Sequence, residues 1–339
     1  MNTKKAKIDR KQNSFALGYA HPSTMVIVDD HEGFLRDMEM NVPRDTLYHS
    51  FSDPREAMES INDFGGVEKN LVHRALAYHG QEGEKVLLEC NIGMLEDGIM
   101  DPSRFDLPTV LVTDYMMPGM DGLELCASIT DRQVKKIMLT GQADENTGID
   151  AFNEGLIDGF VLKSREDAAK EVLRIAKILQ NQYFTDLQNP FLGGSGAITT
   201  LFDDSSTIAR IMEIMEEGGY IEHYLTTEPF GYIVVTADGS LGRIIIFNEQ
   251  DMQHQLRLAK TTNAPKSVID RLESRSHSAV FYQMEPTTYQ QDEYPWGDVV
   301  MPCEKVIGVQ DWWICLDRNG PGPADYSPEK ASFKAKMYN

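Results

Sequence analysis

The stretch LVTDYMMPGMDGLEL, residues 111–125, ends an apolar run with a single acid, Asp114, and continues into a turn rich in Met, Pro and Gly. A continuous apolar run of this kind is typical of a strand that is buried on both faces of a parallel sheet. The residues from Gly122 onward then have the spacing of a helix. This order places Asp114 at the carboxyl end of a strand, which is the edge where open α/β sheets bind their ligands.

The same alternation of strand and helix extends on both sides of this stretch. The predicted strands are TMVIVDD (24–30), TLYHSF (46–51), TVLVTD (109–114), KKIMLTG (135–141) and GFVLKS (159–164). The predicted helices are HEGFLRDMEMNV (31–42), SDPREAMESIND (52–63), GLELCASIT (122–130), ENTGIDAFNEG (145–155) and REDAAKEVLRIAKILQNQYF (165–184). Five strands alternating with five helices predict a parallel sheet with helices on both faces.

Residues 64–107 interrupt this alternation. Apolar residues in VEKNLVHRALAYHG (67–80) and EKVLLECNIGMLEDGI (84–99) recur at helical spacing, so we predict a helical insertion here. The insertion either covers a sheet edge, forms a partner surface, or simply lengthens the domain.

The pattern changes after a turn-rich stretch, QNPFLGGSG, which we interpret as a linker. Two apolar runs that meet at Asp238-Gly239 predict a hairpin, and helix-like and strand-like segments follow, so the second domain is expected to be α+β with an antiparallel sheet. The first 20 residues are read as a docking helix or a disordered arm, and the Gly- and Pro-rich end as a loose tail. The predicted boundaries are 1–22 for the N-terminal extension, 23–187 for the first domain, 188–196 for the linker, 197–320 for the second domain and 321–339 for the tail.

Composition argues against several classes of function. The net charge is −21, and residues 197–339 hold 12 Lys and Arg against 21 Asp and Glu, so binding to nucleic acid phosphates is not expected. No apolar run approaches the ~18 residues of a membrane span, and the basic N-terminus lacks the apolar core of a secretory signal, so we expect a cytoplasmic protein. The four cysteines show no C-x-x-C spacing, which favours core positions over zinc or disulfides.

The residues that end the predicted parallel strands are chemically distinctive. They are Asp29, Asp30, Asp114, Thr140 and Lys163. This set resembles the receiver domain of bacterial two-component response regulators. The resemblance implies a doubly wound five-stranded sheet of flavodoxin-like order 2-1-3-4-5.

The resemblance also implies a role for each of these residues. Asp114 would accept a phosphoryl group, with Lys163 and Thr140 contacting that group. Asp29, Asp30, Asp114 and the backbone carbonyl of Met116 would hold Mg²⁺. Thr140 and Phe160 would be the switch residues. Three carboxylates in one pocket repel one another, and a hard cation compensates that repulsion. The sequence departs from the family at Ser164, where receivers usually have proline, so Lys163 is expected to be held less rigidly.

The overall layout resembles response regulators of the Legionella quorum-sensing type. This implies a cognate histidine kinase or phosphotransfer protein, and a homodimer that depends on phosphorylation, with the N-terminal segment as a candidate contact. The second domain has no G-x-G-x-x-G, no P-loop and no cyclase or phosphodiesterase signature. We therefore expect an output through an unidentified protein partner, with self-phosphorylation as the chain's only catalysis. The alternatives are a receiver-controlled enzyme or nucleotide-binding domain, and a transcriptional regulator that binds DNA.

Overall fold

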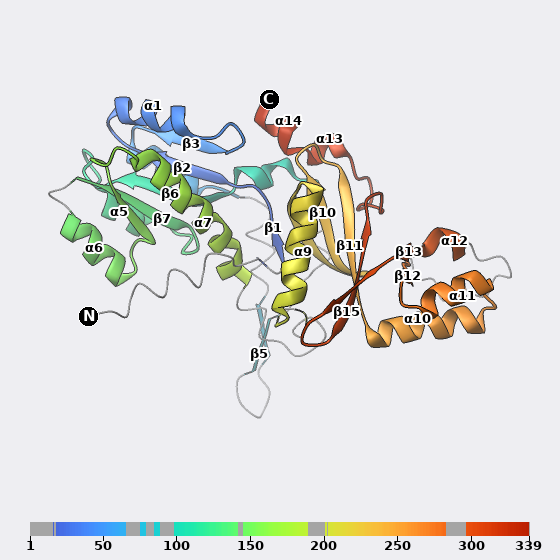
Figure 1. The fold of residues 1–339 in the computed structure, drawn as a ribbon. Helices are drawn as coiled ribbons and strands as arrows, with labels where there is room; N and C mark the ends of the chain where they lie inside the picture. Colours follow the sequence, from blue (N-terminus) through green and yellow to red (C-terminus); the bar gives the residue numbers. More distant parts are fainter. Residues whose placement is uncertain are drawn as a thin grey trace.

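The structure is a computed structural model that describes residues 16, 18–65, 75–78, 85–88, 98–141, 145–188, 201, 203–282 and 296–338. It contains a parallel-sheet domain and an antiparallel-sheet domain, with the C-terminus close to where the two meet (Figure 1). Within the described ranges, no helix has the length and apolar character needed to cross a membrane.

The parallel sheet has the predicted five strands. They are β2 (Thr24–Val28), β3 (Tyr48–Phe51), β6 (Pro108–Asp114), β7 (Lys135–Thr140) and β8 (Gly159–Leu162). Their spatial order is β3-β2-β6-β7-β8, and all neighbours are parallel. Counted within the domain, this is the order 2-1-3-4-5, so the predicted flavodoxin-like topology is confirmed.

Helices cover both faces of this sheet, because successive strand residues point to opposite faces. Two helices, α1 (Glu32–Asn41) and α7 (Ala168–Gln188), pack on the face to which Ile27 points. Three others pack on the face to which Val26 points: α2 (Pro54–Asn62), α5 (Gly122–Ser128) and α6 (Glu145–Glu154). Burial on both faces explains why the strands are continuous apolar runs instead of alternating ones.

The second domain is built on a six-stranded antiparallel sheet. Its order is β1 (Tyr19–Ala20), β9 (Tyr220–Thr227), β10 (Phe230–Thr236), β11 (Leu241–Asn248), β15 (Asp311–Asp317) and β14 (Glu304–Ile307). One face packs against α9 (Ser205–Gly218). The predicted hairpin at Asp238-Gly239 is confirmed as the turn between β10 and β11, where Gly239 adopts a φ of 84°.

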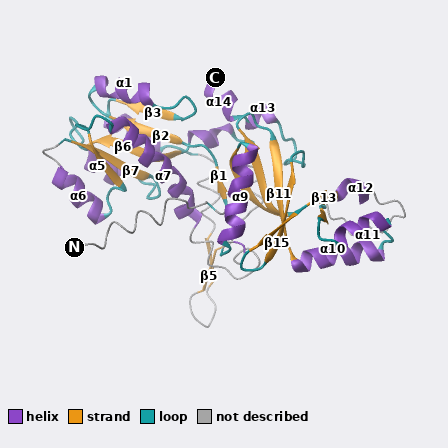
Figure 2. Cartoon of the chain, viewed as in Figure 1, coloured by secondary structure: helices purple, strands orange, loops and turns teal. Residues whose placement is uncertain are grey.

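A smaller lobe extends from the antiparallel sheet and lies farthest from the parallel-sheet domain (Figure 2). It consists of α10 (Glu249–Thr261), α11 (Lys266–Glu273), β12 (His277–Ala279), α12 (Trp296–Val299) and β13 (Val300–Pro302). The strands β12 and β13 pair, and the core contains Ala259, Leu272 and Trp296. Both tryptophans of β15, Trp312 and Trp313, are buried in the adjoining sheet.

The prediction of a helical insertion is wrong where the structure describes it. There, β4 (Ala75–Tyr78) and β5 (Lys85–Leu88) form an antiparallel hairpin, and Pro102–Asp106 is a 3-10 turn, η2. Short, mainly apolar runs such as ALAY and KVLL fit a strand as well as a helix, so spacing alone did not separate the two. The rest of the insertion up to residue 97, and the predicted linker after residue 188, lie outside the described residues.

The prediction of a loose tail is also wrong. The tail forms α13 (Pro328–Ala331) and α14 (Phe333–Tyr338), and Ala331 and Phe333 are buried. The Phe333 ring packs edge-on against Phe105 at a centroid distance of 5.3 Å. The N-terminal extension contributes β1, which pairs with β9 and is neither a helix nor a free arm at these residues. Both segments gain order by packing on the second sheet, which local sequence patterns do not reveal.

A buried ion pair joins the two domains. Arg104, in η2, donates from Nε and Nη2 to the Glu222 carboxylate of β9 at 2.9 and 3.1 Å. Its guanidinium also donates to the carbonyls of Asp101 and Ala331, at 3.0 and 2.9 Å, and Tyr224 donates its hydroxyl to Glu222 at 2.6 Å. We call these five residues the domain junction.

Candidate functional site

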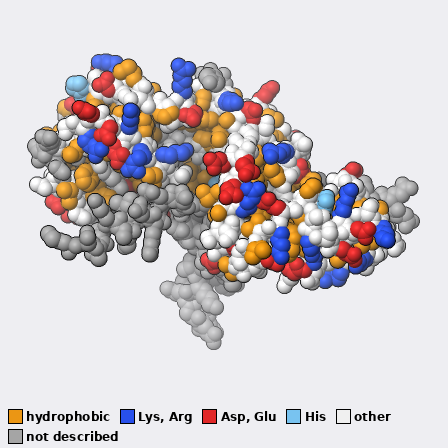
Figure 3. Space-filling view, in the orientation of Figure 1, with side chains coloured by type: hydrophobic (Ala, Val, Ile, Leu, Met, Phe, Trp, Pro, Cys, Tyr) orange, Lys and Arg blue, Asp and Glu red, His pale blue; other side chains and the backbone are white. Residues whose placement is uncertain are grey.

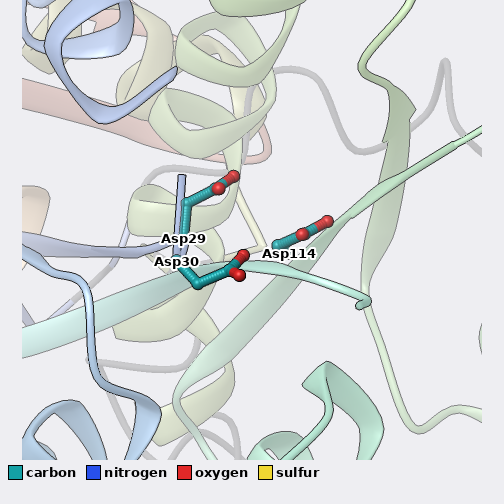
Figure 4. A group of neighbouring side chains, drawn as sticks. All are labelled: Asp29, Asp30 and Asp114. Atoms are coloured by element: carbon teal, nitrogen blue, oxygen red, sulfur yellow. The ribbon is translucent and has the colours of Figure 1, made fainter. Parts of the chain in front are cut away.

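Three carboxylates gather where the parallel strands end. Asp29 and Asp30 follow β2, and Asp114 is the last residue of β6. One carboxylate oxygen from each lies within 4.8 Å of the others, and Figure 4 shows the three side chains clustered at this edge of the sheet. The parallel register pairs Val28 with Thr113, so the two strands end side by side and bring their acids together.

Lys163 joins the carboxylates from the end of β8. Its Nζ lies 2.6 Å from Asp29 Oδ2 and 2.9 Å from Asp114 Oδ2, and 4.8 Å from the centroid of the Phe34 ring. The Lys163 backbone N–H donates to the Thr140 carbonyl at 2.9 Å. The lysine is therefore fixed by its backbone and by three side chains even though Ser164 follows it. We call Asp29, Asp30, Asp114 and Lys163 the strand-end pocket.

The pocket holds more negative charge than it neutralises, with three carboxylates against one ammonium. Asp29 is fully buried and Asp114 is 7% exposed. Burial raises the pKa of Asp114 above its usual value, and the hydrogen bond and charge of Lys163 oppose that shift. Asp29 Oδ1 accepts from the His31 N–H at 2.9 Å, and the buried Oδ2 has the Lys163 ammonium as its partner at 2.6 Å. Hard oxygen donors with surplus negative charge fit a hard cation such as Mg²⁺.

The turn after Asp114 explains the Gly-rich sequence around it. A Cβ on Gly122 would lie 2.3 Å from the Asp114 carbonyl oxygen, so this position requires glycine. The Gly122 N–H donates to the Tyr115 carbonyl at 2.9 Å, and the Thr113 hydroxyl donates to the Asp114 carbonyl at 3.0 Å. Met116 lies within this turn with its side chain 64% exposed. The turn therefore holds the Asp114 backbone, and the role of the Met116 carbonyl stays a prediction.

Thr140 and Phe160 lie next to each other under α6. A Cβ on Gly148, in that helix, would meet Thr140 Cγ2 at 3.3 Å and the Phe160 ring at 3.5 Å. Thr140 is completely buried, yet its hydroxyl has no hydrogen-bond partner among the described residues. Phe160 is half-buried and packs edge-on against Phe152 at 6.4 Å. A buried hydroxyl without a partner is costly, which is typical of a position kept for an incoming group.

Sequence reasoning missed several residues that shape this site. Phe34 faces the Lys163 ammonium, His31 donates to Asp29, and Gly148 makes room for Thr140 and Phe160. In the sequence, Phe34 is one apolar residue of the predicted helix 31–42, and nothing in its spacing indicates a contact with Lys163. The Asp-x₇-Gly spacing between Asp114 and Gly122 is a signal that could have shown the need for glycine.

Comparisons with known proteins agree with this geometry. The response regulator receiver domain family matches residues 96–174, a segment that holds Asp114, Thr140 and Lys163. The transcriptional regulatory protein CseB of Streptomyces coelicolor is 35% identical over 81 residues, which are 21% of this chain and 35% of that protein. The chain thus matches about a third of that relative.

Similarity to one solved structure extends over nearly the whole molecule. The response regulator LqsR of Legionella pneumophila is 27% identical, with a TM-score of 0.75, and the match covers 96% of this chain and 97% of that one. The similarity therefore includes the antiparallel domain as well as the parallel sheet. Residues 96–174 thus match the receiver domain, the module of two-component phosphorelays, and the layout of the whole chain is similar to that of the response regulator LqsR.

Proposed function

We propose that Asp114 accepts a phosphoryl group from a histidine kinase or phosphotransfer protein in a step that requires Mg²⁺, and that this changes dimerisation and a non-DNA output. The observation that carries the proposal is the shared Lys163, whose ammonium contacts both Asp29 and Asp114 at the strand ends. The remaining charge of the pocket is unbalanced, and Thr140 presents a buried hydroxyl without a partner among the described residues. We place this relay in the cytoplasm.

The residues of the pocket have distinct tasks in the transfer. A carboxylate oxygen of Asp114 attacks phosphorus, so an O–P bond forms as the bond from phosphorus to the donor's histidine nitrogen breaks. Phosphoryl transfer needs mainly positioning and charge stabilisation, which Lys163 supplies from 2.9 Å. Mg²⁺, held by Asp29, Asp30, Asp114 and the Met116 carbonyl, would supply charge neutralisation for the carboxylates and the phosphoryl oxygens.

Thr140 and Phe160 connect the pocket to the surface. The Thr140 hydroxyl has no partner among the described residues, and a phosphoryl group on Asp114 offers oxygens that can accept a hydrogen bond from it. Phe160 shares the space under Gly148 with Thr140. A shift of this pair would move α6 and β8. The surface above exposes three apolar side chains, Ile149, Phe152 and Leu156, at 38%, 41% and 41%. This face, together with the N-terminal segment, is our candidate for the phosphorylation-dependent homodimer contact.

The second domain is better suited to a protein partner than to DNA. Its region holds 12 Lys and Arg against 21 Asp and Glu, and on the face shown in Figure 3 the basic side chains are mixed with acidic ones. A cavity of about 220 Å³, lined by residues that include Phe247, His254 and Tyr282, lies between α10 and the sheet. It is smaller than the roughly 300–1,000 Å³ of most small-molecule sites. A larger cavity of about 560 Å³, lined by residues that include Phe184, Tyr220 and Phe333, lies where the two domains meet, so cavity size does not decide the nucleotide-binding alternative.

The test combines intact mass and assembly. The native chain is incubated with Mg²⁺ and acetyl phosphate for mass spectrometry, and with Mg²⁺ and beryllofluoride for light scattering on a sizing column. The native chain should gain one phosphoryl group and change its molar mass, whereas Asp114→Asn should do neither. Asp121→Asn is the matched control, because Asp121 caps α5 in the same turn and Asn caps helices equally well. A phosphoryl group on the Asp114→Asn protein would refute the assignment of Asp114 as the acceptor. Phosphorylation of the native chain without any change in the molar mass of its assembly would refute the phosphorylation-dependent dimer.

The two alternatives for the output domain have their own measurements. A thermal-shift panel of nucleotides that raises the melting temperature of the native chain would support a nucleotide-binding output. DNA retention that falls steeply with salt concentration would support a transcriptional regulator, since phosphate contacts release counterions. We expect neither response.

A further inference from the structure

Two cysteines lie opposite each other at an edge of the antiparallel sheet. The register of β14 and β15 pairs Glu304 with Ile314, so the next pair along is Cys303 with Cys315. The Cys303 N–H donates to the Ser276 carbonyl at 3.0 Å, so Cys303 and Cys315 do not exchange a pair of backbone hydrogen bonds. Opposite residues of this kind have Cα atoms ~4.5 Å apart, and a disulfide spans ~4.4–6.8 Å between Cα atoms.

The surroundings of the two thiols differ. Cys315 is buried, and its sulfur lies 2.8 Å from the Ser278 hydroxyl. Cys303 is half-buried and donates to the Arg275 carbonyl at 3.5 Å. The Cys315 thiol also hydrogen-bonds Cys303 and lowers its pKa, with smaller contributions from Ser278 and the Arg275 charge, while the pKa of Cys315 is raised. Cys303 is therefore the accessible nucleophile and Cys315 the buried partner.

Arg275 adds a cation with an unused donor. One of its terminal nitrogens, Nη2, donates to Glu249 at 2.6 Å, and the other, Nη1, is buried without a hydrogen-bond partner among the described residues. The Arg275 guanidinium lies 5.8 Å from the centroid of the Trp313 ring. Trp313 and Cys315 are two residues apart in β15, so their side chains point to the same face of the sheet. A guanidinium near a thiol stabilises the thiolate, which is the reactive form.

We propose that Cys303 and Cys315 form a modification site for peroxides, in which the pair is oxidised to an intramolecular disulfide. The Cys303 sulfur attacks one peroxide oxygen, the O–O bond breaks, and a sulfenic acid and one water result. The Cys315 sulfur then attacks the Cys303 sulfur, and the displaced hydroxide takes the Cys315 proton and leaves as a second water. Two thiols and one hydrogen peroxide thus give one disulfide and two waters.

The disulfide changes how the small lobe joins the sheet. It would replace the contact of Cys303 with Arg275, which joins the β13–β14 connection to the end of α11, and the contact of Cys315 with Ser278, which joins β15 to β12. The cross-link also ties the β13–β14 connection to the sheet covalently. This modification is independent of Asp114, which lies in the other domain.

The experiment uses the full chain carrying Cys90→Ser, so that the remaining thiols are Cys126, Cys303 and Cys315. The protein is treated with hydrogen peroxide, free thiols are blocked with iodoacetamide, and peptides are mapped without reduction. We expect a linked pair of peptides holding Cys303 and Cys315, a mass lower by two hydrogen atoms, and recovery of both thiols with dithiothreitol. Cys126 is an internal control, because burial raises the pKa of its thiol to about 12.

Variants separate this site from general oxidation. Cys303→Ser should fold, because the position is half-buried, and should not lose two hydrogen atoms on treatment with peroxide. Peroxide should raise the melting temperature of the parent protein and leave that of Cys303→Ser unchanged. Three outcomes would overturn the proposal: sulfinic acid at Cys303 with Cys315 still free, disulfides between two chains, or alkylation of Cys126 that declines as fast as that of Cys303.

Discussion

The domain junction and the strand-end pocket both bury charge, but they differ in how completely that charge is paired. At the junction, Arg104 and Glu222 are matched one to one, and Tyr224 and two carbonyls complete their hydrogen bonds. In the pocket, Lys163 pairs with both Asp29 and Asp114 while Asp30 adds a third carboxylate, and the buried Thr140 hydroxyl has no hydrogen-bond partner among the described residues.

This contrast separates a structural cluster from a functional one. A buried network that is fully satisfied resists change, because removing one partner leaves the other unpaired. A network with surplus charge gains free energy from a ligand that supplies what is missing. The junction should therefore respond strongly to mutation and weakly to ligands, and the pocket should do the opposite.

Breaking the junction should have the largest effect on stability. Arg104→Met leaves the Glu222 carboxylate buried without its cation, which costs about 3–5 kcal/mol of the free energy of unfolding. The double variant Arg104→Met with Glu222→Leu should regain most of that loss, because the uncompensated charge is gone. Urea denaturation of the three proteins measures both effects.

Lys336→Met is the matched control for the junction. Lys336 pairs with Asp106 at 2.7 Å at the same interface, but both side chains are about a third exposed. Solvent-exposed pairs contribute roughly 0–1 kcal/mol, so this variant should lose little. A loss in Arg104→Met no larger than that in Lys336→Met would show that the junction is not a structural determinant.

Acid should weaken the same region of the molecule through His223. This residue of β9 is buried, its Nε2 contacts the Ala16 carbonyl, and burial lowers its pKa from 6.5 to about 4. Below pH 6.5 the unfolded chain binds a proton that the folded chain rejects, so stability falls as the pH falls from about 6.5 to about 4. The full shift corresponds to ~3 kcal/mol.

Urea midpoints between pH 7.5 and pH 4.5 test this dependence. His223→Gln should flatten the slope in that window, whereas His254→Gln, at an exposed position, should keep it. An unchanged slope in His223→Gln would assign the acid sensitivity to other groups.

The sequence predicted the pocket better than the junction. Asp29, Asp114 and Lys163 end apolar strands, and the rules of parallel sheets bring such ends together. Arg104 and Glu222 are 118 residues apart and belong to different domains, so no local periodicity connects them. The prediction of a loose tail failed for the same reason, since Phe333 packs against Phe105, which lies in a distant part of the sequence. The sequence pattern of a segment predicts its secondary structure, but not the distant part of the chain against which it packs.

In the pocket, removing a carboxylate should stabilise the protein. Burial raises the pKa of Asp114, so its charge lowers the stability of the folded state as the pH rises through the folded pKa. Without Mg²⁺ at pH 7, Asp114→Asn should raise the free energy of unfolding. The gain should shrink as the pH falls through the raised pKa of Asp114, because the native carboxylate then binds a proton.

Magnesium should reverse the order of stability of native protein and Asp114→Asn. At ten times its dissociation constant, a ligand adds about 1.4 kcal/mol to the stability of a protein that binds it only when folded. Native protein should gain this with Mg²⁺, and Asp114→Asn should gain less. Asp53→Asn, at the cap of α2, is the control and should behave as native does. Equal Mg²⁺ responses in native protein and Asp114→Asn would remove Asp114 from the metal site.

The smallest change in stability is expected on substitution of Thr140. The parallel sheet holds two buried threonine hydroxyls that can be compared, one that donates a hydrogen bond and one without a partner among the described residues. Thr113→Val removes a hydroxyl that donates to the Asp114 carbonyl and should cost about 1 kcal/mol, because that carbonyl loses its donor. Thr140→Val removes a hydroxyl that has no partner among the described residues, so stability should change by less than about 0.5 kcal/mol or rise.

The response to beryllofluoride then tests whether the Thr140 hydroxyl has a role in signalling. If its hydroxyl is kept for the phosphoryl group, Thr140→Val should still bind Mg²⁺ but lose the beryllofluoride-induced change in molar mass. A costly Thr140→Val would mean that the hydroxyl already has a structural partner in the folded protein. A neutral variant with an intact beryllofluoride response would mean that the signal leaves the pocket by another route. The unpaired group is informative because its removal should cost the fold nothing and the switch a great deal.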